Sequence, residues 1–167
     1  MSAEATVREY YEALRRGDPL APFFADLSSE TEDAAAVKYG IGERLVGHGA
    51  IAAGLRDQTR STADWTVESG SLRVVERPDH AWFSDEVFMA WTDLNADRER
   101  AFETRWSGTL ERREDEWLFV GMHVSVPRRI GEGEGDGRAT PDRDEASDGN
   151  GTPTGDDTRA DGDAGRG

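Results

Sequence analysis

The chain has 167 residues, enough for one ordinary domain, and a formal net charge of −15. No apolar run approaches the roughly 20 residues of a membrane-spanning helix, and an acidic chain lacks the basic patch that nucleic acids require, so we expect neither a membrane nor a nucleic acid as partner. Cysteine is absent, which excludes disulfides and thiolate chemistry. The N-terminal residues lack the basic region and apolar stretch of a secretory signal, which favours a cytoplasmic location.

The basic residues are almost all arginine, because Lys38 is the only lysine among 20 bases. Many carboxylates with almost no lysine are typical of proteins from salt-loving microbes such as halophilic archaea, where molar salt screens a strongly negative surface. The alternative is an acidic protein from a mesophile with a GC-rich genome, which also favours arginine.

Apolar residues are concentrated in the first three quarters of the chain. All five Trp precede residue 128, and so does every Leu, Ile, Val and Phe except Ile130. We therefore expect a folded domain over residues 1–127. The acidic segment over 128–167 is rich in Gly and Asp and is predicted to be a disordered tail, because it cannot bury a core.

Helical spacing of apolar residues predicts three helices before the main run of strands. The first ends at Gly17, and its apolar face carries Val7, Tyr10, Tyr11 and Leu14. A short second helix is predicted over residues 20–27. After a polar loop over 28–33 and a strand over 34–41, a third helix is predicted from Gly47 to about Arg60.

The rest of the domain is predicted to be strands. The parity of apolar positions changes across Gly70, between Val67 and Val74, which indicates a β-bulge. Further strands are predicted over 80–91, around 102–110, and over 118–126 with unbroken alternation. This order predicts an α+β fold, in which three N-terminal helices pack on a curved, mostly antiparallel sheet and form a cone with a cavity between helices and sheet.

Three stretches have the order and spacing of a known family: Val7–Leu14 with Gly17-Asp18, Val37–Gly42 with Gly47 and Ala50-Ile51, and Trp117–Val120 with His123–Ser125. Together they resemble the SnoaL-like branch of the nuclear transport factor 2-like superfamily, also called the ketosteroid isomerase-like cone fold. The resemblance implies a small-molecule ligand in the cavity and pairing of two copies through the sheet as a homodimer. The fold hosts isomerases, dehydratases, cyclases and association domains, so it does not by itself give the function.

The resemblance also implies where a site would lie. It places the His123 and Ser125 pair of the closing strand in the cavity, together with Tyr10. The carboxylate base of a steroid isomerase would fall near Tyr39, where the sequence has no carboxylate, so we exclude that activity. The candidate ligand-binding residues are Tyr10, Tyr39, Trp82, Arg105, Trp106, His123 and Ser125. Alternation warns that Arg105 and Trp106 point to opposite faces of one strand.

Three functions fit these observations. The first is a ligand-binding domain of unassigned ligand without established catalysis. The second is a lyase, isomerase or cyclase acting on a small organic acid or ketone, with His123 as general base and Tyr10 polarising the substrate; a purely structural histidine is the alternative for His123. The third is an association domain. Three scattered histidines lack metal-ligand spacing, so we expect no metal and no cofactor.

The charge balance generates the first testable prediction. Repulsion among the excess carboxylates destabilises the compact domain at low ionic strength, and salt screens this repulsion. The melting temperature should therefore rise steeply between low and molar KCl, as followed by circular dichroism. A flat profile would contradict the halophilic interpretation.

Overall fold

The computed structural model describes residues 1–28 and 35–127, which belong to one compact unit that extends from Met1 to Arg129. The tail expected over 128–167, and the loop expected over 28–33 apart from Ser28, lie outside the described residues. The elements in chain order are helix α1 (Ala3–Arg16), a 3₁₀ turn η1 (Ala21–Phe23), strands β1 (Val37–Gly40) and β2 (Glu43–Val46), helix α2 (His48–Ser61), and strands β3 (Thr62–Ser69), β4 (Arg73–Glu76), β5 (His80–Asp93), β6 (Arg98–Arg113) and β7 (Glu116–Ser125). Neither described helix has the length and apolar character needed to cross a membrane.

Helix α1 forms where the sequence predicted it, and both of its ends are capped. The Ser2 side chain accepts a hydrogen bond from the amide of Ala5 at 3.1 Å, which satisfies one of the free donors of the first turn. Gly17 ends the helix in the left-handed region, with φ +70°, where a residue without a Cβ is favoured. The predicted apolar face is buried. Arg15 anchors the end of the helix by donating to the carbonyl oxygen of Val67 in β3 at 2.8 Å.

The second predicted helix is wrong, because residues 1–28 and 35–127 hold two α-helices, with a single 3₁₀ turn over Ala21–Phe23 in place of the helix predicted there. The backbone becomes extended at Phe24, and this residue forms a parallel β-bridge with Phe119 of β7. The amide of Ala25 then donates to the carbonyl oxygen of Phe119 at 3.0 Å. Hydrogen bonding to the sheet therefore replaces the helical bonds that the spacing of apolar residues had favoured.

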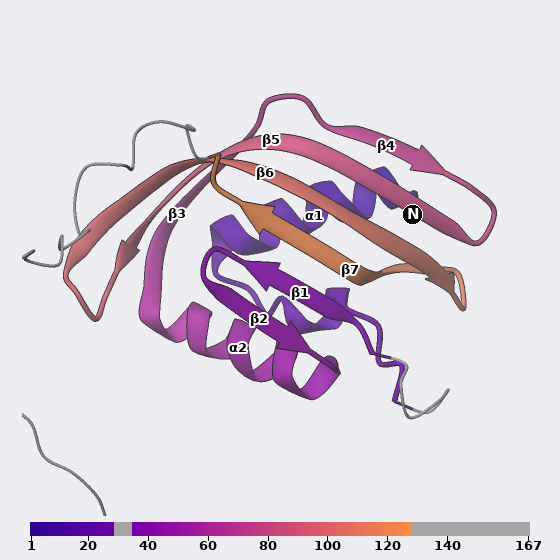
Figure 1. Ribbon diagram of the computed structural model, residues 1–167, viewed down its shortest axis with the longest axis horizontal. Coiled ribbons are helices and arrows are strands. Elements are labelled where there is room, and N and C mark those ends of the chain that lie inside the picture. The colour runs from indigo at the N-terminus through magenta and orange to yellow at the C-terminus, as the bar shows by residue number, and fades with distance from the viewer. Residues whose placement is uncertain (29–34, 128–167) are drawn as a thin grey trace, which may run out of the picture. The chain divides into compact units, whose positions relative to one another are not determined.

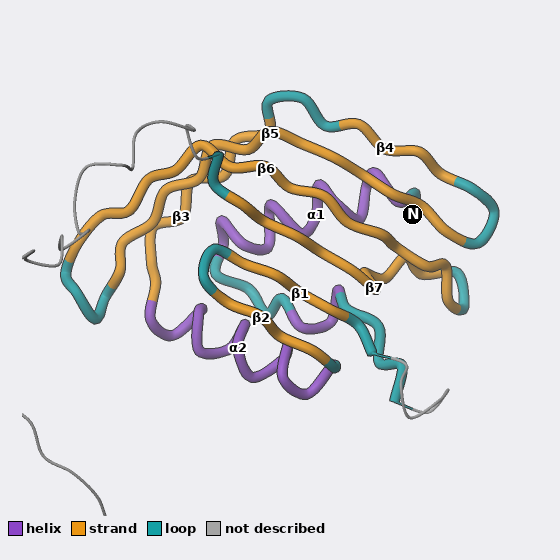
Figure 2. The backbone as a smooth tube through the Cα atoms, in the orientation of Figure 1, coloured by secondary structure: helices purple, strands orange, loops and turns teal. Residues whose placement is uncertain are grey.

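The sheet has the strand order β2-β1-β7-β6-β5-β3, and β4 also pairs with β5. All pairs are antiparallel except β1 with β7. Figure 1 shows α1 behind the long strands and α2 beside the β1–β2 hairpin, and Figure 2 shows β5 and β6 curving along the length of the sheet. The α+β architecture with a mostly antiparallel sheet is as predicted, whereas β2 was not predicted from the sequence.

Three register changes help decide which side chains face the helices, and the first lies in β3 between Ala63 and Thr66. Pairing moves from Ser69 opposite Val87 to Arg73 opposite Ser84, so the β3–β4 side carries one extra residue near Gly70, as the change in parity predicted. In β7 the register shifts at Val120, which lies between the residues that pair with Thr109 and Leu110. The unbroken alternation predicted for this strand is therefore wrong: Trp117 and Phe119 are buried, and Leu118 and Val120 are not.

A buried carboxylate joins α1 to the sheet. The sequence places Asp85 and Glu86 in a strand that is otherwise mostly apolar, so one of them points inward and needs a partner. The inward residue is Asp85, which is 4% exposed and accepts hydrogen bonds from the Tyr11 hydroxyl at 3.2 Å and the Ser71 amide at 2.9 Å. Burial, together with the negative Asp85, raises the pKa of the Tyr11 phenol well above its usual value, so Tyr11 remains a donor.

This contact generates the second prediction. Tyr11→Phe removes one donor from a buried carboxylate and should lower the free energy of unfolding by about 1–3 kcal/mol. Tyr39→Phe is the matched control, because Tyr39 is 42% exposed, and it should leave stability unchanged. Urea unfolding of both variants measures the difference. Equal stability of the two variants would contradict a stabilising role for the Tyr11–Asp85 hydrogen bond.

Candidate functional site

A cavity of about 590 Å³ lies between the helices and the inward face of the sheet. This volume is within the range of roughly 300–1,000 Å³ found for small-molecule sites. Both helices, the β1–β2 hairpin and strands β3, β5, β6 and β7 contribute to its wall. Its lining includes Tyr10, Lys38, Glu43, Trp65, Trp91 and Phe102.

One part of the wall is aromatic. The rings of Trp65 and Trp91 are stacked, with centroids 4.8 Å apart and an interplanar angle of 18°, and Phe102 lies 5.5 Å from Trp91. The indole N–H of Trp65 donates to the Thr62 hydroxyl at 2.9 Å, which restricts the orientation of that ring. All three rings are only partly buried. The cavity therefore presents flat apolar surface on which a planar group can stack.

Another part of the wall carries an ion pair between a buried lysine and a partly exposed glutamate. Lys38 points inward from β1, is 4% exposed, and its ammonium contacts the carboxylate of Glu43 in β2. The two residues meet because Gly40 has no side chain: a Cβ at Gly40 would lie 2.5 Å from Oε1 of Glu43. Burial, and secondarily the charge of Glu43, raises the pKa of the Tyr10 phenol far above its usual value. Tyr10 is therefore a neutral hydroxyl close to this ion pair.

The remaining polar groups lie at the tip of the β5–β6 hairpin and on α2. Asp93 accepts hydrogen bonds from the amides of Ala96 and Asn95, both at 3.1 Å, and its carboxylate lies 3.4 Å from Arg100. These contacts, the Ala96 amide foremost, lower the pKa of Asp93. Asp57 of α2 also lines the cavity and is exposed. Among the residues that the structure describes, no three His, Asp or Glu side chains come together as ligands for a metal ion.

The structure does not bring the predicted site residues together in one cavity. Tyr10 and Trp106 line the cavity, and Trp106 does so because its side chain faces α1. The strand period places His123 on the opposite face, where it is exposed, since its neighbours Met122 and Val124 are buried. Its ring lies 6.0 Å from that of Tyr39, which also points outward. The expectation that the closing-strand pair lines the cavity with Tyr10 therefore fails on geometry.

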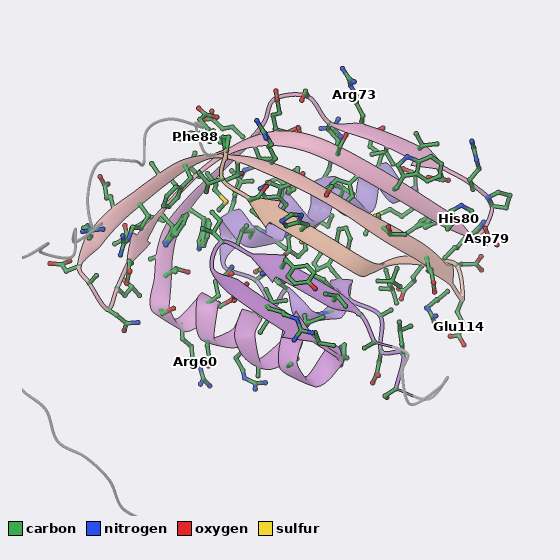
Figure 3. All side chains as sticks on the ribbon, in the orientation of Figure 1. Arg60, Arg73, Asp79, His80, Phe88 and Glu114 are labelled. Carbon is green, nitrogen blue, oxygen red and sulfur yellow. The ribbon has the colours of Figure 1, made fainter. Side chains whose placement is uncertain are left out.

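The outward residues form a separate group. Arg105, His123 and Ser125 line an open hollow of about 530 Å³ on the outer face of the sheet. Trp82 is not part of it, and its ring lies 5.6 Å from the Arg77 guanidinium and 6.0 Å from the His80 ring. Figure 3 shows His80 beside Asp79 at the turn between β4 and β5.

The sequence interpretation did not single out Lys38 and Glu43 as site residues. The family resemblance pointed to Tyr39 in this strand, where the base of a steroid isomerase would fall, and its neighbour Lys38 was not among the candidates. One signal was available in the composition, because the chain uses lysine at this single position.

Family comparison agrees with the fold. The SnoaL-like domain profile matches residues 3–129, and the chain belongs to this family. No curated protein matches the sequence. The resemblance found in the three sequence stretches is thus confirmed at the level of the family.

Solved structures with similar folds come from several bacteria. A nuclear transport factor 2-like protein from Salmonella enterica is 16% identical, with 79% of this chain and 93% of that chain covered and a TM-score of 0.65. A proposed dehydratase of the same superfamily from Streptomyces avermitilis is 20% identical, with 74% and 93% covered and a TM-score of 0.64. A ketosteroid isomerase-like protein from Erwinia carotovora is 17% identical, with 75% and 94% covered and a TM-score of 0.61. At these identities the likeness establishes the fold alone.

The close approach at Gly40 generates the third prediction. Gly40→Ala should displace the Glu43 side chain from Lys38 and lower the free energy of unfolding by about 1–3 kcal/mol, the usual cost of overpacking. Gly121→Ala is the matched strand control, because its Cβ would meet nothing within 4 Å. Urea unfolding compares the two variants. Equal stability would show that the Glu43 side chain moves aside without loss.

Proposed function

We propose that this protein binds a small molecule with a flat apolar body and one polar group in the cavity between the helices and the sheet. The observation that carries this proposal is the presence, in a single cavity, of the stacked Trp65 and Trp91 rings and the partly buried Lys38–Glu43 ion pair. Small-molecule sites combine a largely apolar wall with a few polar groups that fix the ligand's orientation.

The charges of the cavity wall agree with an uncharged or singly charged ligand. Each of the two cationic side chains on the wall has an acidic neighbour: Lys38 contacts Glu43, and Arg100 lies 3.4 Å from Asp93. A multiply charged anion such as a phosphate ester would have to compete with both carboxylates. A planar molecule with a hydroxyl or carbonyl group can instead stack on the indoles and hydrogen-bond to the polar part of the wall.

The names of structural neighbours point in the same direction. Structures described as a proposed dehydratase and as ketosteroid isomerase-like share this fold, which supports a site for small organic molecules without assigning a reaction. His123 lies across the sheet from Tyr10, so the geometry gives no support to a reaction in which these two residues act on one ligand.

Pairing of two copies through the outer face of the sheet stays a prediction. Trp82 and Tyr39 are 43% and 42% exposed on that face, and a second copy would cover such apolar surface. Sedimentation equilibrium at molar salt measures the mass in solution. A monomer at all protein concentrations would contradict pairing.

Replacing one wall indole tests the ligand site. Trp91→Leu removes stacking area and should weaken binding of naphthylmethanol, a planar alcohol, by about three- to tenfold. Trp82→Leu is the matched control, because Trp82 lies on the outer face of the sheet, and it should leave affinity unchanged. Titration calorimetry measures both affinities, and native mass spectrometry of the purified protein shows any ligand that remains bound. Equal loss in both variants, or no binding by the unmodified protein, would contradict the proposed site.

A further inference from the structure

The single lysine of this chain stands where a lysine is least expected. All other basic residues are arginine, yet Lys38 is the one base among the described residues that is buried. Arginine serves at least as well in a buried ion pair, because its guanidinium is more weakly hydrated and can hold a carboxylate with two hydrogen bonds. Charge pairing with Glu43 therefore does not explain why this position holds lysine.

Lysine differs from arginine in one chemical property that matters in a cavity. Its ammonium can lose a proton and become a nucleophilic amine, whereas the guanidinium remains protonated. Amines of this kind attack the carbonyl carbon of aldehydes and ketones and form Schiff bases. Lys38 projects this group into the cavity that the aromatic rings also line.

The neighbours of Lys38 are the groups that such a reaction requires. Glu43 touches the ammonium and can accept its proton, and Gly40 leaves the space that this contact needs. Tyr10 contributes a neutral phenol to the same cavity, since burial and the Glu43 charge raise its pKa. A base beside the amine and a hydroxyl that can hydrogen-bond to a carbonyl oxygen are therefore both present.

We propose that Lys38 forms a Schiff base with an aldehyde or ketone bound in this cavity. The proposal rests on the proposed function, because the aromatic wall has to hold the body of the same molecule. In the reaction, the Lys38 ammonium gives a proton to Glu43, and the free amine forms a bond to the carbonyl carbon.

The remaining steps balance within the site. The carbonyl oxygen takes up the proton that the attacking nitrogen loses, which gives a neutral carbinolamine, and Glu43 then returns its own proton as this hydroxyl leaves as water. The ammonium and the carbonyl compound are thus converted to a protonated imine and one water, without oxidant or reductant. The class of ligand is a carbonyl compound with a planar apolar body.

Reductive trapping tests this assignment directly. The full chain is incubated with naphthaldehyde and cyanoborohydride, which converts an imine into a stable secondary amine. Lys38 is the single lysine of the sequence, so peptide mass mapping distinguishes its adduct from one on the α-amino group of the protein used. We expect one naphthylmethyl group on Lys38. Labelling confined to the α-amino group would overturn the proposal.

A matched exposed amine shows whether the cavity promotes the reaction. Arg44→Lys introduces an amine on β2 at an exposed position that pairs with the outward Tyr39. Lys38 should be labelled at least tenfold faster than this introduced amine in the same molecule. Lys38→Arg keeps the positive charge beside Glu43 and should lose the cavity adduct while it stays folded by circular dichroism. Equal or slower labelling of Lys38 would contradict a reactive amine.

Replacing Glu43 separates a role as proton acceptor from the effect of burial alone, because burial alone would not make the labelling rate of Lys38 depend on Glu43. Glu43→Gln removes the proton acceptor and should slow labelling of Lys38 by about a hundredfold, in the range typical of general acid–base catalysis. Binding of naphthylmethanol, which has no carbonyl group, separates this proposal from the proposed function. If the alcohol binds and no Lys38 adduct forms, the ligand site stands and the Schiff base is refuted. If neither occurs, both proposals fail.

Discussion

The packing of α1 on the sheet through two adjacent tyrosines is the interaction on which the rest of the structure depends. The Tyr10 ring contacts four other aromatic rings, all at steep angles, among them those of Trp106 and Phe119. Tyr11 packs edge-on against Trp106 and hydrogen-bonds to Asp85. Successive helix residues point about 100° apart, so the two side chains fix the rotation of the helix as well as its position. Tyr10 thereby reaches the cavity, and Tyr11 does not.

The local periodicity of apolar residues was sufficient to predict those helices and strands whose own sequence shows a clear helical or alternating pattern. Helices α1 and α2 and the long strands β5, β6 and β7 lie close to the residues predicted for them. The errors fall where tertiary contacts decide the conformation. Phe24 has helical spacing but follows the edge of β7, and Val120 has strand parity but lies at a register shift. Local periodicity predicts neither contact. Phe24 depends on Phe119, which lies almost a hundred residues further along the chain, and Val120 depends on how β7 pairs with β6.

The sequence predicted where the candidate site lies, but it did not predict most of the residues that form the site. The order of elements predicted a cavity between helices and sheet, and Tyr10 and Trp106 line it. The alternation of side chains along the strand correctly placed Trp106 and Arg105 on opposite faces of the sheet, but it could not show which face the helices cover. The polar groups of the cavity were expected to include His123 and Ser125 of the closing strand. The structure instead supplies the polar groups of the cavity from the β1–β2 hairpin, around Lys38, from the tip of the β5–β6 hairpin, around Asp93, and from α2.

The position of the ion pair also distinguishes the cavity from a packing defect. Protein interiors are usually filled to crystal-like density, and buried charges cost free energy even when they are paired. Here the hairpin that carries Lys38 and Glu43 is pressed against α2, since a Cβ at Gly54 would lie 2.6 Å from the Leu45 side chain. The chain packs closely at Gly54 and leaves open space beside Lys38. Poor packing in general therefore does not explain that open space. Stability alone accounts for neither the open volume nor the charged wall, whereas the ligand proposed above would account for the two together.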